Sequence, residues 1–138
     1  MRILLASYIL FLNISASGQS VEGIWKVLNK KGELQSHVEV YEENGYLYGK
    51  CIELFDSAVH RKCKKCRGAD QDKSLKGMIL FKDCKFDGTK WSEGRILDPK
   101  KGRFYDCQIS LKNANTLKVR GYLGNPLFGR TLLWYRAK

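Results

Sequence analysis

The sequence is poor in the residues that usually perform enzyme chemistry. It has only two histidines: His37 falls in a predicted strand, and His60 falls in a loop without a nearby serine and aspartate arrangement. No glycine-rich phosphate-binding loop is present. Asp70 and Asp72 supply too few oxygen ligands for a calcium loop. We therefore predict no catalytic residues, no cofactor and no metal site, and we expect a protein that is not an enzyme.

Long apolar runs are also scarce, and the one clear example lies at the N-terminus. Arg2 is followed by the apolar run 3–14 and then by four small residues. This three-part pattern is typical of a cleaved signal peptide. The run is shorter than the roughly 20 residues that span a membrane, which leaves an uncleaved anchor as the weaker alternative. We predict a signal peptide over residues 1–18, cut at its end or after Ser17, export to the periplasm or the exterior, and one domain over 19–138.

Acidic residues are few, since 14 Asp and Glu stand against 25 Lys and Arg, for a net charge of +11. A basic surface favours anionic partners. The lysines are scattered, however, with pairs in three predicted turns or loops at 30–31, 64–65 and 100–101. The aromatic, basic and glycine pattern of an RNA-binding sheet is absent. We expect no nucleic-acid binding, and we retain weak contact with anionic glycans or lipids of the cell envelope as an alternative function.

The sequence does contain a series of short runs rich in Val, Ile, Leu, Tyr and Phe, without helical periodicity. Asn44-Gly45 and Asp87-Gly88 are strong hairpin signals between runs, because these residues accept positive φ. The pattern predicts eight strands: 21–28, 34–41, 46–55, 77–85, 91–97, 103–111, 116–123 and 130–136. Three glycines lie inside these runs and suit the sharp bends of a small barrel: Gly49, Gly94 and Gly121.

Sequential hairpin connections between eight strands predict an all-β, antiparallel up-and-down barrel. An open sheet or a two-sheet sandwich with the same strand order is the alternative. Closure of the barrel would remove exposed strand edges. A barrel of eight strands is either filled by its own side chains or holds one small ligand.

Five cysteines in an exported chain indicate disulfide bonds, with at least one thiol left over. Cys63 and Cys66 form a Cys-x-x-Cys pair among basic residues, inside the one long predicted loop at about 56–75. A bond between them closes about four residues and contributes roughly 2 kcal/mol in the chain-entropy model. It is the favoured pairing because these two residues are certain to be neighbours. Bonds to the loop, bonds to one another and buried free thiols stay open for the others: Cys51, Cys84 and Cys107.

The same motif admits a redox or metal role as an alternative function. His60 would extend it to His-x-x-Cys-x-x-Cys, but a structural zinc site needs a fourth ligand and usually two paired sets. Basic neighbours such as Lys64 and Lys65 would favour the reactive thiolate. A thioredoxin-type site, however, needs a helix N-terminus in a βαβ unit, and neither is predicted. We therefore rank this role for Cys63 and Cys66 below a disulfide that stiffens the loop.

A set of motifs spans the chain: GIWK from Gly23, YLYGKCIEL from Tyr46, CKKCRG from Cys63, KGMILF from Lys76, GRILDPKKGRFYDC from Gly94, LKVRGYLG from Leu117 and GRTLLWYR from Gly129. This combination resembles the secreted bacterial family called domain of unknown function 2147 (DUF2147), over essentially the whole mature chain. The resemblance implies a lipocalin-like or streptavidin-like barrel and no established activity. In lipocalins, the tryptophan of a Gly-x-Trp on the first strand closes the barrel floor beneath an arginine, which implies the same pairing here for Trp25 and Arg136.

Aromatic residues are numerous for a small barrel and could line a pocket with apolar walls and a few polar groups. The ligand-pocket candidates are Trp25, Tyr48, Phe81, Tyr105, Tyr122 and Trp134. The alternative interpretation is that most of these rings fill the core or cover the outer face. Our leading hypothesis is an exported, non-enzymatic, lipocalin-like protein that binds a small, mainly apolar ligand. We expect the loop that contains Cys63 and Cys66 to guard the entrance of the pocket.

Overall fold

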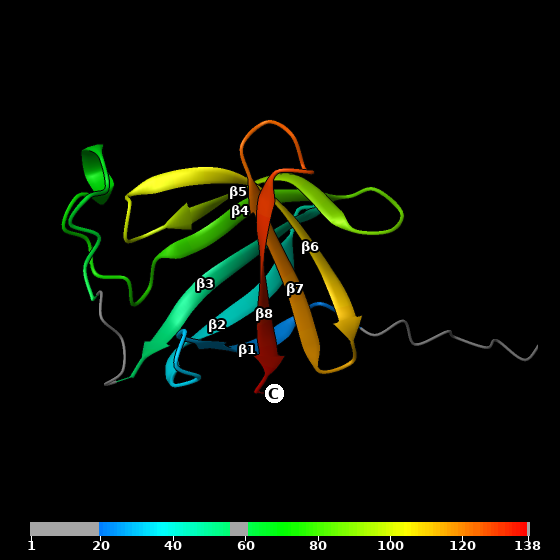
Figure 1. The fold of residues 1–138 in the computed structure, drawn as a ribbon, viewed down its shortest axis with the longest axis horizontal. Helices are drawn as coiled ribbons and strands as arrows, with labels where there is room; N and C mark the ends of the chain where they lie inside the picture. Colours follow the sequence, from blue (N-terminus) through cyan, green and yellow to red (C-terminus); the bar gives the residue numbers. More distant parts are fainter. Residues whose placement is uncertain (1–19, 56–60, 138) are drawn as a thin grey trace, which may run out of the picture.

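The computed structural model describes residues 20–55 and 61–137, and in these ranges the chain forms eight strands and one short 3-10 turn (Figure 1). The strands are β1 (Gly23–Leu28), β2 (Leu34–Glu43), β3 (Tyr46–Leu54), β4 (Ile79–Phe86), β5 (Trp91–Asp98), β6 (Arg103–Asn113), β7 (Thr116–Tyr122) and β8 (Gly129–Arg136). The turn η1 (Gly68–Asp70) lies in the long loop between β3 and β4. All eight predicted strands are present, and their ends differ from the prediction by about two residues or fewer.

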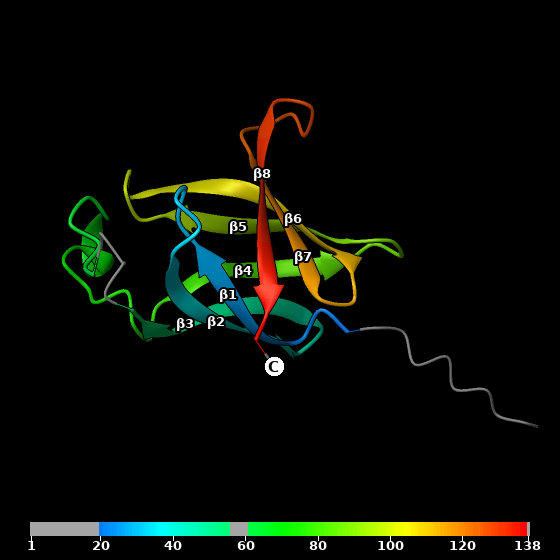
Figure 2. The same ribbon diagram turned by 60° about the horizontal axis from the view of Figure 1, so that its bottom comes forward.

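The strands form a closed barrel in sequential order, and each pairs antiparallel with its neighbours. Closure comes from the pairing of the first and last strands, where Trp25 lies opposite Arg136 and Lys26 opposite Tyr135. Figure 2 shows β8 lying across β1 at this seam. The prediction of an all-β, eight-stranded up-and-down barrel is therefore confirmed, and the open or two-sheet alternative is wrong.

The hairpin signals produce the turns that they predicted. Asn44 and Gly45 both have positive φ, at 53° and 84°, and they connect β2 to β3 in two residues. In the turn from β4 to β5, the carboxylate of Asp87 accepts hydrogen bonds from the backbone N–H groups of Thr89 and Lys90, and Gly88 takes the positive φ. These local preferences fix the register of the strands on either side.

The two ends of the barrel have different connections. At one end, here called the closed end, lie the three short turns β2–β3, β4–β5 and β6–β7. At the other, called the open end, lie the turns β1–β2 and β5–β6, the loop β7–β8 and the long loop from residue 55 to residue 78. The long loop contains η1 and projects to one side of the barrel (Figure 1).

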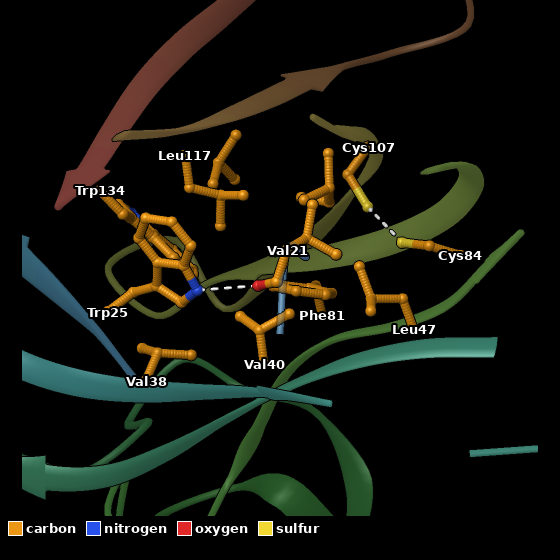
Figure 3. Packing of buried hydrophobic residues seen from close by; sticks show 12 residues of the cluster. Val21, Trp25, Val38, Val40, Leu47, Phe81, Cys84, Cys107, Leu117 and Trp134 are labelled. Carbon is orange, nitrogen blue, oxygen red and sulfur yellow. Dashed lines mark hydrogen bonds between the residues drawn. The ribbon is translucent and has the colours of Figure 1, made fainter. Parts of the chain in front are cut away.

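The main hydrophobic core fills the barrel toward the closed end (Figure 3). Its fully buried members include Trp25, Leu47, Phe81, Ile109 and Leu117. Glycines on neighbouring strands leave room for them, and a side chain at Gly49 would overlap the ring of Phe81. Removal of such apolar side chains from water supplies the main driving force for folding.

A second, smaller core lies between the long loop and the barrel wall. Its buried members are the disulfide-bonded pair Cys63–Cys66 together with Leu75, Met78 and Leu97. The Cys63 N–H donates to the Lys73 carbonyl, which pairs the two arms of the loop. The long loop is therefore packed against β5 by its own apolar residues.

Candidate functional site

A cavity of about 600 Å³ occupies the barrel at its open end. Its walls are mainly apolar, and the apolar residues come from six of the eight strands and from the long loop: Val27, Leu28, Leu54, Leu75, Leu80, Ile96, Leu97, Val119, Leu132 and Trp134. Polar atoms are interspersed among them, on Asn29, Gln35, Ser36, Tyr105 and Tyr122. The volume lies within the roughly 300–1,000 Å³ that is usual for small-molecule sites. The combination of apolar walls with a few polar groups is also typical of such sites.

Cationic side chains line the mouth of this cavity. Lys30 comes from the β1–β2 turn, Lys100 and Lys101 from the β5–β6 turn, and Arg130 from the start of β8. The one carboxylate in the lining belongs to Asp98, and it already accepts a hydrogen bond of 2.9 Å from the Lys100 backbone N–H. The mouth is therefore basic, in contrast to the apolar walls behind it.

Trp25, which is predicted to close the floor of the barrel, has a fully buried side chain. Its indole Nε1 donates a hydrogen bond of 2.9 Å to the Val21 carbonyl, as Figure 3 shows. The guanidinium of Arg136 lies 4.3 Å from the centre of the Trp25 ring and donates to the Ser20, Glu22 and Ala114 carbonyls. This cation–π contact brings the predicted pair together and ties both ends of the described chain to it, and the part of the pair in closing the barrel floor stays a prediction.

The six predicted pocket residues lie in three different places. Tyr105, Tyr122 and Trp134 line the cavity. Trp25 and Phe81 are fully buried in the core and do not line it. Tyr48 points away from the interior: it stacks on Tyr41 at 5.6 Å, and its hydroxyl lies 3.4 Å from the Asp83 carboxylate. The part that any of the six plays in ligand binding stays a prediction.

Two of the polar side chains in the lining differ in their surroundings. The Nε1 of Trp134 is buried and has no hydrogen-bond partner among the described residues. A buried N–H without a partner is costly, and this one is covered by protein atoms rather than exposed to the cavity. Burial, and second the nearby Asp106 carboxylate, raise the pKa of Tyr122, which keeps its hydroxyl neutral at ordinary pH.

The disulfide between Cys63 and Cys66 stiffens the long loop at the cavity's side, and the sulfur atoms are buried. Because buried disulfides are poorly accessible to attacking thiolates, this geometry favours a structural role over redox exchange. Cys51 is a free thiol that lines the cavity, and burial raises its pKa.

The sequence left a bond between Cys51 and Cys84 open, and the structure does not bring these two together. The register of β3 and β4 places Leu47 opposite Cys84. Cys84 instead lies 3.5 Å, sulfur to sulfur, from Cys107 on β6 (Figure 3). The contact with Cys84, followed by burial, raises the pKa of Cys107, which keeps the Cys107 thiol neutral.

Some sequence-based expectations fall on residues that the structure does not describe, namely His60 and the predicted signal peptide at residues 1–18. Within the described ranges, no three His, Cys, Asp or Glu side chains gather in a way that could hold a metal ion. Within the same ranges no helix has the length and hydrophobicity to cross a membrane. His37 lies on a strand and packs edge-on against Phe55 at 4.9 Å.

Sequence reasoning missed most of the residues that form the cavity walls and mouth. The signal that could have found them is the alternation of inward and outward side chains in each strand, extended toward the open end. On β7, for example, Val119 and Gly121 lie on the same inward face as the buried Leu117 and line the cavity. Sequence reasoning also does not predict the exposed apolar residues of the β7–β8 loop, Leu127 and Phe128, because they lie in a segment with the composition of a turn.

These features define a class: a lipocalin-like barrel, closed at its floor and hollow at the opposite end. The chain belongs to a family described as "Uncharacterized protein conserved in bacteria (DUF2147)", whose model matches residues 23–136. Among solved structures it is similar to a protein described as "Protein HP1028 from the human pathogen Helicobacter pylori belongs to the lipocalin family". That likeness has a TM-score of 0.74 and 22% identity, over 88% of this chain and 85% of the other, and it supports the fold. A search of curated proteins gave no match.

Proposed function

We propose that this chain is an exported, non-enzymatic binding protein that holds a small, mainly apolar ligand in the cavity at its open end. The observation that carries the proposal is the cavity of about 600 Å³ with apolar walls above a closed floor. Export rests on the signal-peptide pattern of residues 1–18, which precedes the family match.

Buried apolar area is the expected source of affinity. Transfer of a ligand from water into such a cavity contributes roughly 25 cal/mol per Å² of apolar surface removed from water. The hydroxyls of Tyr105 and Tyr122 supply the few polar contacts that orient a ligand.

A cavity-filling variant tests the proposal directly. Gly121 lines the cavity from β7, and a Cβ at this position would meet no heavy atom closer than 3.6 Å. Gly121→Leu is therefore expected to fold normally and to fill part of the cavity. The matched control is Lys118→Leu, which places the same side chain at an exposed position on the same strand.

The probe is the neutral apolar fluorophore N-phenyl-1-naphthylamine, competed with 1-decanol. Wild type and Lys118→Leu should bind it and release it to 1-decanol, whereas Gly121→Leu should bind at least about tenfold more weakly. Equal binding by all three proteins, or no binding by a folded wild type, would refute the proposal. Native mass spectrometry of protein purified from its own host, with extraction of apolar compounds, then identifies the ligand.

A further inference from the structure

Beside the apolar cavity lies a second depression with a different character, here called the basic cleft. It has a volume of about 830 Å³. Its charged side chains are Lys65, Arg67, Arg95, Lys101 and Arg103, with the single carboxylate of Asp70. These cations come from the long loop, from β5, from the β5–β6 turn and from the start of β6. Residues that are far apart in the sequence therefore place positive charges around the same cleft.

Packing holds these like charges in place. Gly102 in the β5–β6 turn has φ of 63°, and a side chain there would overlap the Lys65 carbonyl group and the Cys66 backbone nitrogen. The disulfide of Cys66 with Cys63 fixes the loop at the same point. Close packing of two basic segments costs electrostatic repulsion, which a bound anion would relieve.

Most of the cations in the cleft are free to meet an anion. Arg95 faces Asp106 at 3.9 Å, and Asp70 faces Lys73 at 3.5 Å. Within residues 20–55 and 61–137, the other four cations form no ion pair: Lys65, Arg67, Lys101 and Arg103. Two of these are guanidinium groups, which match the oxygen geometry of phosphate by paired hydrogen bonds.

The basic cleft adjoins the apolar cavity, because Lys101 and Leu123 line both. We propose that the ligand is an amphiphile whose phosphate-class head group binds in the basic cleft while its apolar chain occupies the cavity. This inference rests on the proposed function and adds the chemical class of the ligand. Four unpaired cations favour a doubly charged phosphate group over a singly charged carboxylate, since they exceed what one negative charge would neutralise.

The experiment compares three probes: decyl phosphate, 1-decanol with the same chain and no charge, and inorganic phosphate with the charge and no chain. Affinities are measured by calorimetry at low and high salt. Decyl phosphate should bind at least about tenfold more tightly than 1-decanol, and the excess should shrink as salt rises because exposed charges are screened.

The variant Arg67→Gln with Arg103→Gln removes two cations from the cleft and retains long polar side chains. It should lose about tenfold or more in affinity for decyl phosphate, with 1-decanol unchanged. The control Lys112→Gln with Lys118→Gln removes the same two charges at exposed positions on β6 and β7 and should leave both affinities unchanged. Folding of each variant is checked by its thermal unfolding midpoint.

Each alternative result has a separate meaning. Equal binding of decyl phosphate and 1-decanol would overturn the head-group inference and leave the proposed function standing. Inorganic phosphate binding as tightly as decyl phosphate would show that cleft and cavity act separately, which also overturns it. Equal losses of affinity for decyl phosphate in both double variants would show that only the net charge of the protein matters and not the position of the cations in the cleft. That result would also overturn the head-group inference. Failure of both decyl compounds to bind would count against the proposed function itself.

Discussion

The two ends of the barrel are made from the same eight strands, yet one is filled and the other is hollow. At the closed end, Trp25, Leu47 and Phe81 are fully buried, and Gly49 opposite Phe81 leaves space for its ring. At the open end, the inward positions of β7 are Val119 and Gly121, which leave the interior unfilled. The distribution of large and small inward residues along each strand therefore decides where an eight-stranded barrel retains a cavity.

Charge also differs between the two ends. The long loop and the β5–β6 turn bring Lys65, Arg67, Lys101 and Arg103 together at the open end. At the closed end, the β2–β3 turn is flanked by Glu42 and Glu43, while the β4–β5 turn contains both Asp87 and Lys90. The clustered cations of the open end therefore favour an anionic group beside the cavity.

The largest expected effect follows from removal of the floor. Trp25→Ala deletes a fully buried ring, its hydrogen bond to Val21 and its contact with Arg136. Substitutions of this kind cost about 3–5 kcal/mol, because the lost burial is compounded by the cavity left behind. Urea unfolding should show this loss. The exposed neighbour of Arg136, Tyr135, provides the control, and Tyr135→Ala should cost far less. A loss below about 1 kcal/mol for Trp25→Ala would show that the floor contributes little to stability.

A pair of glycine substitutions compares the packing of the two ends directly. At Gly94 in β5, a methyl group would overlap the Cys84 sulfur and the Lys82 carbonyl oxygen, whereas at Gly121 in β7 it would meet only ordinary contacts. Gly94→Ala should therefore cost about 1–3 kcal/mol through overpacking. Gly121→Ala should be neutral or stabilising by about 0.5–1 kcal/mol, because it restricts the unfolded chain. Chemical denaturation measures both, and the same sign for the two would contradict the contrast between the ends.

Much of the barrel could be predicted from the sequence, because its determinants are local. Alternating apolar residues set each strand, and Asn44-Gly45 sets a turn by its own φ preference. The interior glycines are predicted as bends, and the strand register is irregular at Gly49 and Gly94. These two glycines also make room for Phe81 and Cys84 on the neighbouring strand. Such a relation depends on register between strands and is not visible in a single stretch of sequence.

The site was harder to predict than the fold for the same reason. Tyr105, Tyr122 and Trp134 were identified by residue type, but type alone also selected Tyr48, which lies on the outer face. The basic residues of the long loop were noticed, yet nothing in the sequence shows that Gly102 brings the β5–β6 turn against them. Contacts between segments almost forty residues apart, such as Gly102 and Lys65, arise only when the barrel closes.

A smaller effect is expected where the long loop meets the barrel. Gly102 and Gly32 both have positive φ, at 63° and 79°, but a Cβ at Gly32 would meet nothing within 4 Å. Gly32→Ala should therefore cost only about 1 kcal/mol, from the strained backbone. Gly102→Ala should cost about 1 kcal/mol more, because it also displaces the Lys65 backbone. Thermal unfolding gives the two losses, and decyl phosphate binding should weaken in Gly102→Ala alone. Equal stability losses would show that the turn and the loop are not packed together.

The smallest effect concerns two turns, one at each end, that are capped by similar side chains. The Asp87 carboxylate accepts from the backbone N–H groups of Thr89 and Lys90, and these hydrogen bonds lower its pKa to about 2 from an ordinary value of 3.8. At the open end, the neutral Asn29 amide oxygen accepts from the Lys31 and Glu33 N–H groups in the same way. The Asn29 amide also donates to the Glu33 carboxylate at 3.3 Å. The closed-end turn should nevertheless respond more strongly to pH, because there the carboxylate itself accepts the backbone hydrogen bonds.

A carboxylate whose folded pKa is lowered stabilises the fold above its unfolded pKa, and this contribution disappears as pH falls through the folded value. The stability difference between wild type and Asp87→Asn should accordingly be constant near neutral pH and shrink between about pH 4 and pH 2. The difference between wild type and Asn29→Ala should change less over that range, since the amide acceptor itself does not titrate there. Urea unfolding at a series of pH values measures both differences. A loss of stability in Asp87→Asn that is the same at every pH would mean that the negative charge of Asp87 does not contribute. The side chain would then act only as a neutral hydrogen-bond acceptor, as Asn29 does.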